Sequence, residues 1–156
     1  PGIGFLARLA GTVFINRNPR DAAQQRDVLA DHIEAGHKLL FFPEGTSTDN
    51  FRVLPFRSTL FQAFFDQSGI SDLHIQPVTV IYSAPTGEDP RFYGWWGDME
   101  FAPHLLRLMA ARRRGEVKLI YHPPVRLADF AGRKPLAAHL ENTVRAGMPP
   151  DRRIAE

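Results

Sequence analysis

The apolar residues of the chain follow two spacings, one typical of helices and one typical of strands. The helical spacing predicts helices at residues 3–9, 19–35, 60 to about 69, 103–114 and 135–146. Short apolar runs predict strands at residues 12–15, 39–42, 74–82 and 117–121. Residues 83–97 are rich in proline, glycine and aromatic residues, which predicts a long loop. Because helices and strands alternate, we expect an α/β fold, a single domain whose mostly parallel sheet is flanked by helices.

Local signals sharpen some of these elements. Asn18 and Pro19 are residue types that begin a helix, and Gly36 can adopt the left-handed conformation that ends one. Residues 39–42 are apolar throughout, as in a strand that is covered on both faces. Pro77 cannot donate a ladder hydrogen bond, so it predicts an edge strand or a bulge.

Composition narrows the class of protein. The chain has 156 residues, of which 44% are hydrophobic and 23% charged, as in one globular domain. It contains no cysteine, so disulfides and thiolate metal sites are excluded. No apolar run reaches the roughly 18–20 residues of a membrane-spanning helix. Because the chain begins with Pro1 rather than methionine, we expect residues 1–156 to be one domain whose amino-terminal part is missing.

The charge distribution leaves two interpretations open. The formal net charge is +2 at pH 7, the isoelectric point is about 9.3, and three arginines are adjacent at residues 112–114. Such a run suits an anionic partner, either a phosphate ligand or an acidic membrane surface. It is also typical of the solvated end of a charged helix.

Polar residues follow two of the predicted strands. Ligands of open α/β sheets bind beyond the carboxyl ends of the strands, where Arg17 and Glu44 are found. A guanidinium group fits a phosphate, and a carboxylate can accept a hydrogen bond from a substrate hydroxyl. Gly45 would let backbone amides approach an anion, and Thr46 could add a hydroxyl donor. The structural alternative is that Arg17 pairs with a carboxylate and that Glu44 and Gly45 simply form a turn.

Three segments, in this order and at these separations, resemble the second, third and fourth blocks of the glycerolipid acyltransferase family, which includes the 1-acyl-sn-glycerol-3-phosphate acyltransferases. They are residues 11–17 (GTVFINR), 42–46 (FPEGT) and 76–81 (QPVTVI). The FPEGT segment is the most specific of the three. Arg57 resembles a basic position that follows the third block in many members. The resemblance covers about the first half of the chain.

The resemblance implies roles for the second and third blocks. Arg17 would help to hold the phosphate of the acceptor, and Arg57 would be a further basic contact. Glu44, Gly45 and Thr46 would line the acceptor site. Ser47 stands where an arginine is frequent in the family, which removes one phosphate contact and weakens the case for a phosphorylated acceptor.

The fourth block is associated in this family with the acyl chain. Pro77 and Val78 would therefore help to shape an apolar slot, although as a bare pattern these residues are typical of a core strand. The resemblance implies no metal and no tightly bound cofactor.

Acyl transfer to an alcohol needs a base for the hydroxyl proton and donors for the developing oxyanion. The family supplies the base with a His-x-x-x-x-Asp motif, in which the aspartate orients the imidazole. None of the six histidines of this chain is followed by an aspartate at that spacing. We therefore expect no catalytic residue in this chain, the motif upstream of Pro1, and negligible turnover by residues 1–156 alone.

The leading hypothesis is an O-acyltransferase of phospholipid biosynthesis. It would move a fatty acyl group from acyl-carrier protein or acyl-CoA to the free hydroxyl of a lysophospholipid, with lysophosphatidate as the first candidate. We expect it at the cytoplasmic face of the bacterial inner membrane, peripheral or anchored by the missing amino-terminal region, and without a nucleic-acid partner. Candidate membrane contacts within the chain are the apolar residues near its start and the aromatic loop at residues 92–96.

Two alternatives remain. One is a non-enzymatic module that binds a lipid headgroup or an anion. The other is a different α/β enzyme, for example a hydrolase that uses Asp49 or Ser47. The sequence contains no Gly-x-Ser-x-Gly elbow, Walker-type loop or paired-histidine metal motif, which argues against this second alternative.

Overall fold

The computed structural model describes residues 31–33, 35–65 and 72–153, and the chain divides into two units, Pro1–Leu39 and Leu40–Glu156. The predicted helix at 3–9, the predicted strand at 12–15 and most of the predicted helix at 19–35 lie outside the described residues. The end of that last helix is described. Gly36 has a φ of +75°, and its N–H donates to the carbonyl of Ile33 at 2.9 Å. The left-handed helix end predicted at Gly36 is therefore confirmed.

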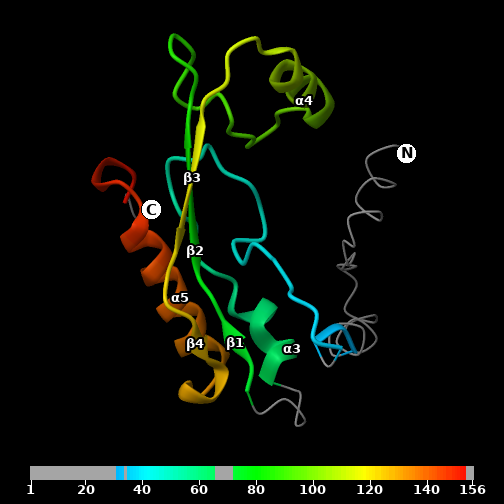
Figure 1. Cartoon of the computed structure of the whole chain (residues 1–156), viewed down its shortest axis with the longest axis vertical. Coiled ribbons are helices and arrows are strands. Elements are labelled where there is room, and N and C mark those ends of the chain that lie inside the picture. The colour runs from blue at the N-terminus through cyan, green and yellow to red at the C-terminus, as the bar shows by residue number, and fades with distance from the viewer. Residues whose placement is uncertain (1–30, 34, 66–71, 154–156) are drawn as a thin grey trace. The chain divides into compact units, whose positions relative to one another are not determined.

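The second unit is built on an antiparallel ladder. β2 (Val78–Ser83) pairs with β3 (Glu116–Tyr121), and the shorter β1 (His74–Ile75) pairs with β4 (Val125–Arg126), as Figure 1 shows. Both pairs are antiparallel, so the mostly parallel sheet predicted from the sequence is wrong for the described strands. The reason lies in α4 (Phe101–Ala110), the helix between β2 and β3. It lies beyond the end of the ladder instead of running back along it, so the chain re-enters the sheet at the end from which it left.

The predicted strand at residues 74–82 is interrupted at Pro77. Two residues, Gln76 and Pro77, separate the ladders on one strand, whereas three residues, 122–124, separate them on the other. The carbonyl of Pro77 accepts a hydrogen bond from the N–H of His122 at 3.0 Å. The side-chain amide of Gln76 donates to the carbonyl of His122 at 3.1 Å. This one-residue offset is a bulge whose extra residue lies on the strand opposite Pro77, and it interrupts the ladder at the position where Pro77 predicted an interruption.

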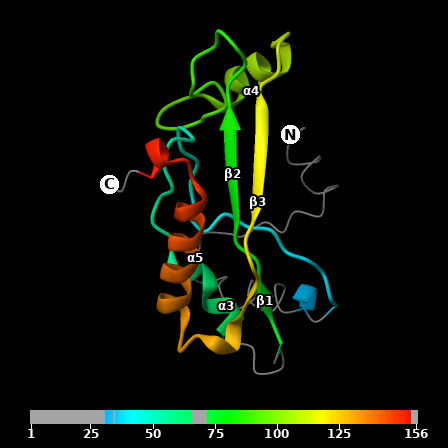
Figure 2. The same cartoon turned by 60° about the vertical axis from the view of Figure 1, so that its left-hand side comes forward.

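The core lies between the ladder and α5 (Arg133–Gly147), which runs alongside β2 and β3 in both views (Figures 1 and 2). Leu136 and Leu140, one helical turn apart, are 0% and 3% exposed, so α5 buries the apolar stripe that the spacing predicted. The 3₁₀ turn Ser58–Phe61 and the short helix α3 (Gln62–Phe65) close the core on another side. Phe61 and Phe64 of these two elements form a cluster with Phe41, in which the centroids of the three rings are 5.4 to 6.3 Å apart.

The apolar run at residues 39–42 does not form the doubly covered strand that its composition predicted. Leu40 is 82% exposed and Phe42 is 66% exposed, and no described strand pairs with residues 40–42. Phe41, which points the other way, packs in the ring cluster. An apolar run specifies burial on both faces only where two layers are present to cover it, and in the described part of the chain one layer covers this segment.

Candidate functional site

The FPEGT segment forms a tight turn that the following loop holds in place. The N–H of Gly45 donates to the carbonyl of Phe42 at 3.2 Å, and Gly45 has a φ of +71°, a conformation that favours glycine. The carboxylate of Glu44 accepts a hydrogen bond from the backbone N–H of Leu54 at 2.7 Å through Oε2. The carbonyl of Pro43 accepts one from the N–H of Arg57 at 2.9 Å. The turn is therefore fixed through both its main chain and its acidic side chain.

Arg57 lies directly against this turn. A Cβ atom at position 45 would be 2.9 Å from Nε of Arg57 and 3.0 Å from its Cδ, so Gly45 is needed for the close approach. Arg57 is exposed, and its guanidinium makes no hydrogen bond or ion pair within the described residues. A guanidinium held against this turn, with its donors unused by the described part of the chain, is suited to bind an anionic group.

Two charged residues of α5, Glu141 and Arg145, act electrostatically on Glu44, and neither of them was identified from the sequence. Glu141 accepts a hydrogen bond from the N–H of Phe56 at 2.9 Å through Oε2, and its Oε1 accepts one from Arg145 at 2.9 Å. The signal that could have found them is the Glu-to-Arg spacing of four residues, which places the two side chains on one face of a helix.

Burial raises the pKa of Glu44. The hydrogen bond from Leu54 and the positive charge of Arg145 oppose this increase in the pKa, and the negative charge of Glu141 adds to it. The carboxyl group therefore holds its proton to a higher pH than an exposed glutamate does.

The structure thus places Arg57 against the turn that contains Glu44 and Gly45, and the role of these residues in an acceptor site stays a prediction. Thr46 is exposed, and its hydroxyl makes no hydrogen bond within the described residues. Arg17 lies outside the described residues, so its convergence with Glu44 stays a prediction.

The two residues predicted for the acyl slot belong to the ladder. Pro77 is buried at the bulge, and Val78 lies opposite Tyr121 at the start of β2. Neither lines a described cavity. Their role in an acyl slot stays a prediction.

Asp49, a candidate of the hydrolase alternative, is fully engaged in holding loops together. It is 5% exposed, and its Oδ1 accepts a hydrogen bond from the N–H of Phe51 at 3.1 Å. Its Oδ2 is 3.3 Å from Arg52 and 3.5 Å from Arg91. Burial alone would raise the pKa of Asp49, but the Phe51 N–H and the two guanidinium groups more than offset burial, so the pKa is lowered. These contacts indicate a structural role.

Asp49→Asn is expected to lower the free energy of unfolding at pH 7 by about 1–3 kcal/mol, because the amide keeps the bond to Phe51 but loses both ion pairs. The lowered pKa of Asp49 means that the folded state favours the ionised carboxylate. The stabilisation from Asp49 is fully present above the ordinary aspartate pKa of about 3.9, and it is lost as the pH falls through the lowered pKa. Urea unfolding at pH 7 and pH 3 should therefore show a difference between parent and variant that shrinks at pH 3. Asp89→Asn is the matched control, since Asp89 accepts an N–H two residues ahead in the same way but is exposed. An equal effect of the control would contradict the prediction.

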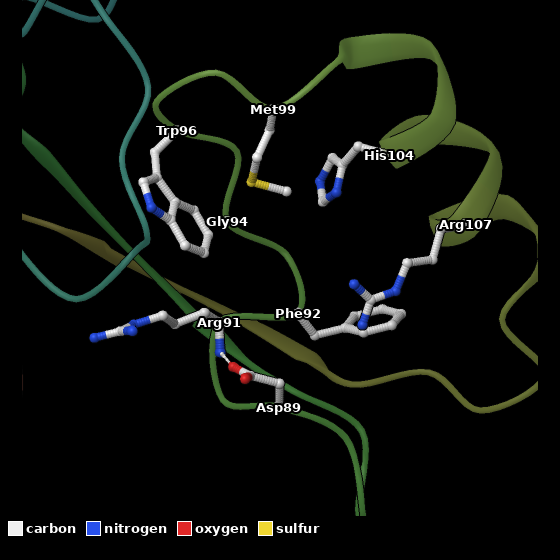
Figure 3. A pocket seen from close by; sticks show the side chains of 8 residues that line it. All are labelled: Asp89, Arg91, Phe92, Gly94, Trp96, Met99, His104 and Arg107. Carbon is white, nitrogen blue, oxygen red and sulfur yellow. Dashed lines mark hydrogen bonds between the residues drawn. The ribbon is translucent and has the colours of Figure 1, made fainter.

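A cavity of about 180 Å³ lies between residues 89–99 and α4. Figure 3 shows the ring of His104 and the side chain of Met99 pointing into it, with the guanidinium of Arg107 over the ring of Phe92 at 5.0 Å. None of the residues predicted for the acceptor site lines it. The cavity and the Glu44 turn are thus separate features, and the loop that follows the turn contacts the cavity segment through the ion pair of Asp49 with Arg91 and the hydrogen bond from the N–H of Trp95 to the carbonyl of Thr48 at 3.2 Å.

The absence of a catalytic histidine from this chain stays a prediction, and the structure describes the surroundings of His104 and His122 in particular. His104 is 8% exposed, and its Nδ1 has no hydrogen-bond partner among the described atoms, so no carboxylate orients its ring there. His122 lies 2.8 Å from the hydroxyl of Thr79, which is fully buried and donates to the carbonyl of Val144 in α5. His122 therefore ties the ladder to α5. Within the described residues no group of three or more histidine, aspartate or glutamate side chains could hold a metal ion.

Comparison with known proteins matches a range that contains the three segments singled out in the sequence. Residues 1–81 match the protein-family model described as Acyltransferase. The chain is 56% identical over 148 residues to a lyso-ornithine lipid O-acyltransferase of Rhodobacter capsulatus, with 95% of this chain and 54% of that protein covered. It is 34% identical to a protein of the same name from Brucella abortus, with 94% and 58% covered.

A more distant relative carries another name. The chain is 27% identical to a 1-acyl-sn-glycerol-3-phosphate acyltransferase of Neisseria gonorrhoeae, with 99% of this chain and 59% of that protein covered. The chain therefore spans a little over half the length of these relatives. No solved structure gives a significant match.

Proposed function

The chain belongs to the acyltransferase family, and from that premise we propose that the protein containing it transfers a fatty acyl group to the hydroxyl of a lyso-ornithine lipid. One observation carries the choice of acceptor. The relative named for lyso-ornithine lipid is 56% identical over 95% of the chain, whereas the Neisseria relative named for lysophosphatidate chemistry is 27% identical over 99%. Lysophosphatidate, the first candidate from the sequence, becomes the second.

The chemistry of the FPEGT turn supports an acceptor of this kind. Ornithine carries a carboxylate and an amine and has no phosphate. The guanidinium of Arg57 would bind the carboxylate. Oε1 of Glu44 accepts no hydrogen bond within the described residues, so it would accept one from the amine or from the reacting hydroxyl. Ser47, where an arginine is frequent in the family, is in keeping with an acceptor without phosphate.

The remaining partners follow from the reaction. The donor would be acyl-CoA or acyl-carrier protein, and because both are cytoplasmic, the protein would work at the cytoplasmic face of the membrane. The base that takes the hydroxyl proton would come from residues outside this chain, and we expect no turnover by residues 1–156 alone. No described helix is long and apolar enough to cross a membrane.

A competition assay tests the acceptor. The full-length protein is given an acyl donor with equal amounts of lyso-ornithine lipid and lysophosphatidate, and ornithine lipid is expected to form at least about ten times faster, a difference of about 1.4 kcal/mol in transition-state binding. Ser47→Arg should narrow that ratio by adding a phosphate contact. Equal rates, or a preference for lysophosphatidate, would overturn the acceptor. Binding of both lipids without transfer to either would instead favour the non-enzymatic headgroup module.

A further inference from the structure

α4 presents an apolar face to solvent. Phe101, Leu106 and Met109 are 39%, 65% and 67% exposed. Positions 101, 105 and 109 fall on one helical stripe, and positions 102 and 106 flank it; all five are apolar. No described segment covers this face. Three large apolar side chains on ten residues of helix form a contiguous patch rather than scattered exposure, and such patches mark sites of interaction.

An aromatic side chain of the preceding turn extends this face. The ring of Trp95 packs edge-on against Phe101 with centroids 5.1 Å apart, and Trp95 is 37% exposed. Its ring N–H donates to the carbonyl of Met99 at 2.7 Å, so the polar atom is satisfied while the ring stays accessible. We call Trp95, Phe101, Leu106 and Met109 the α4 patch.

Positive charge follows the α4 patch along the chain. The arginines at residues 112–114 begin two residues after the end of α4 and are all exposed. Within the described residues, the guanidinium groups of Arg113 and Arg114 donate to backbone carbonyls, of Thr86 and Leu108 respectively, and none of the three arginines pairs with a carboxylate. Two features bind an interfacial helix to an anionic bilayer: an apolar helix face, and basic residues near it that pair with no carboxylate. Both are present here.

We propose that the α4 patch docks onto the surface of an anionic lipid bilayer, with α4 lying in the plane of the interface and residues 112–114 at the headgroups. A helix of ten residues is about 15 Å long, half the thickness of the hydrocarbon core, so α4 can lie on a bilayer but cannot span it. Tryptophan is enriched at this depth because its ring is amphipathic. A bilayer offers both apolar depth and negative charge, whereas a second copy of the chain would bring a second set of arginines to a two-fold contact.

This inference goes beyond the proposed function and stands apart from it, since no residue of the α4 patch belongs to the Glu44 turn. Binding to lipid can therefore be measured without acyl transfer. If transfer fails and docking holds, or the reverse, the two proposals are separated.

Quenching of Trp95 by brominated lipid tests the docking. The full-length protein carrying Trp96→Phe is mixed with vesicles of equal parts phosphatidylcholine, brominated on its acyl chains, and phosphatidylglycerol. The part of the emission that disappears in the Trp95→Phe, Trp96→Phe variant is assigned to Trp95. We expect this part of the emission to be quenched. The double variant with Leu106→Asp and Met109→Asp should lower the partition coefficient of the protein into vesicles, measured by this quenching, by about ten-fold or more. Replacing all three arginines by glutamine should remove the preference for phosphatidylglycerol vesicles over pure phosphatidylcholine vesicles.

Matched controls decide the outcome. Ala138→Asp with Asn142→Asp adds the same two charges to exposed positions of α5 and should leave the quenching unchanged. Leu106→Gln with Met109→Gln repeats the test without added charge, and circular dichroism checks that each variant folds. Unquenched Trp95 would overturn the proposal, and so would quenching that both α4 variants leave intact. If the α4 variants instead lost self-association and kept the quenching, the bilayer proposal would be overturned in favour of a contact between two copies of the protein.

Discussion

The full-length protein with Glu44→Gln is expected to lose acyl transfer by about 100-fold while unfolding at the same urea concentration as the parent or a higher one. The glutamine oxygen can still accept the hydrogen bond from Leu54, so the turn keeps its support. What is lost is the negative charge, which the proposed acceptor contact needs, and one charge-assisted hydrogen bond to a buried group accounts for a loss of this size. Glu44→Ala should lose the activity and also about 1–3 kcal/mol of stability, because the Leu54 N–H is left without its partner.

The raised pKa of Glu44 fixes the sign of the stability effect. Between the unfolded and the folded pKa, the folded chain holds a proton that the unfolded chain has released, so this group lowers stability as the pH rises through the folded pKa. Glutamine has no such penalty, so the variant should gain relative stability on going from pH 4 to pH 7. Initial rates and urea midpoints, measured at both pH values, check the two parts of the prediction.

Glu141→Gln is the matched control for Glu44. Glu141 also accepts a backbone N–H from the same loop, that of Phe56, and it also keeps an acceptor as glutamine. It has an ion-pair partner in Arg145 and is not expected to contact the acceptor, so its activity should change less than about three-fold. If Glu44→Gln retained full transfer, or if both variants lost activity equally, Glu44 would be a structural residue of the turn and the acceptor site would have to be sought elsewhere.

Gly115→Ala is expected to destabilise the protein by about 1–3 kcal/mol or more, the range for forcing an extra methyl group into a packed site. The added Cβ would collide with the carbonyl oxygen of Ser83 and lie 2.9 Å from the ring of Tyr93. Ser83 cannot move away, because it is paired with Glu116 at the end of the β2 and β3 ladder. The N–H of Gly115 also donates to the hydroxyl of Tyr93 at 2.8 Å, a bond that any backbone shift would weaken.

Gly132→Ala provides the comparison for this substitution. Gly132 precedes α5, a Cβ there would meet nothing within 4 Å, and its backbone is extended. The change should cost less than about 1 kcal/mol, the range for an alanine at a helix N-cap. Urea unfolding of both variants measures the difference, and an equal loss would show that the crowding at Gly115 relaxes without cost.

The sequence by itself determined the elements whose signals are local. The apolar stripe of α5, the strands β2 and β3, the left-handed Gly36 and the bulge at Pro77 all follow from side-chain spacing or from the backbone limits of one residue. The same is true of the FPEGT turn, where one glycine with a positive φ and one acidic side chain define the geometry. The family could likewise be predicted from the sequence, because each of its characteristic blocks is a short, contiguous segment.

Other features depended on residues far apart in the chain. The same apolar runs could pair in parallel or antiparallel, and it was the position of α4 beyond the ladder that made the pairing antiparallel. The helix predicted at residues 103–114 ends at Ala110, and Gly115 lies beyond it, where it permits the approach of Ser83. Glu141 reaches a loop 85 residues away, and Asp49 reaches Arg91. Periodicity reports which face of an element is apolar, but only tertiary packing decides which other surface meets that face, because this choice rests on contacts between residues distant in sequence.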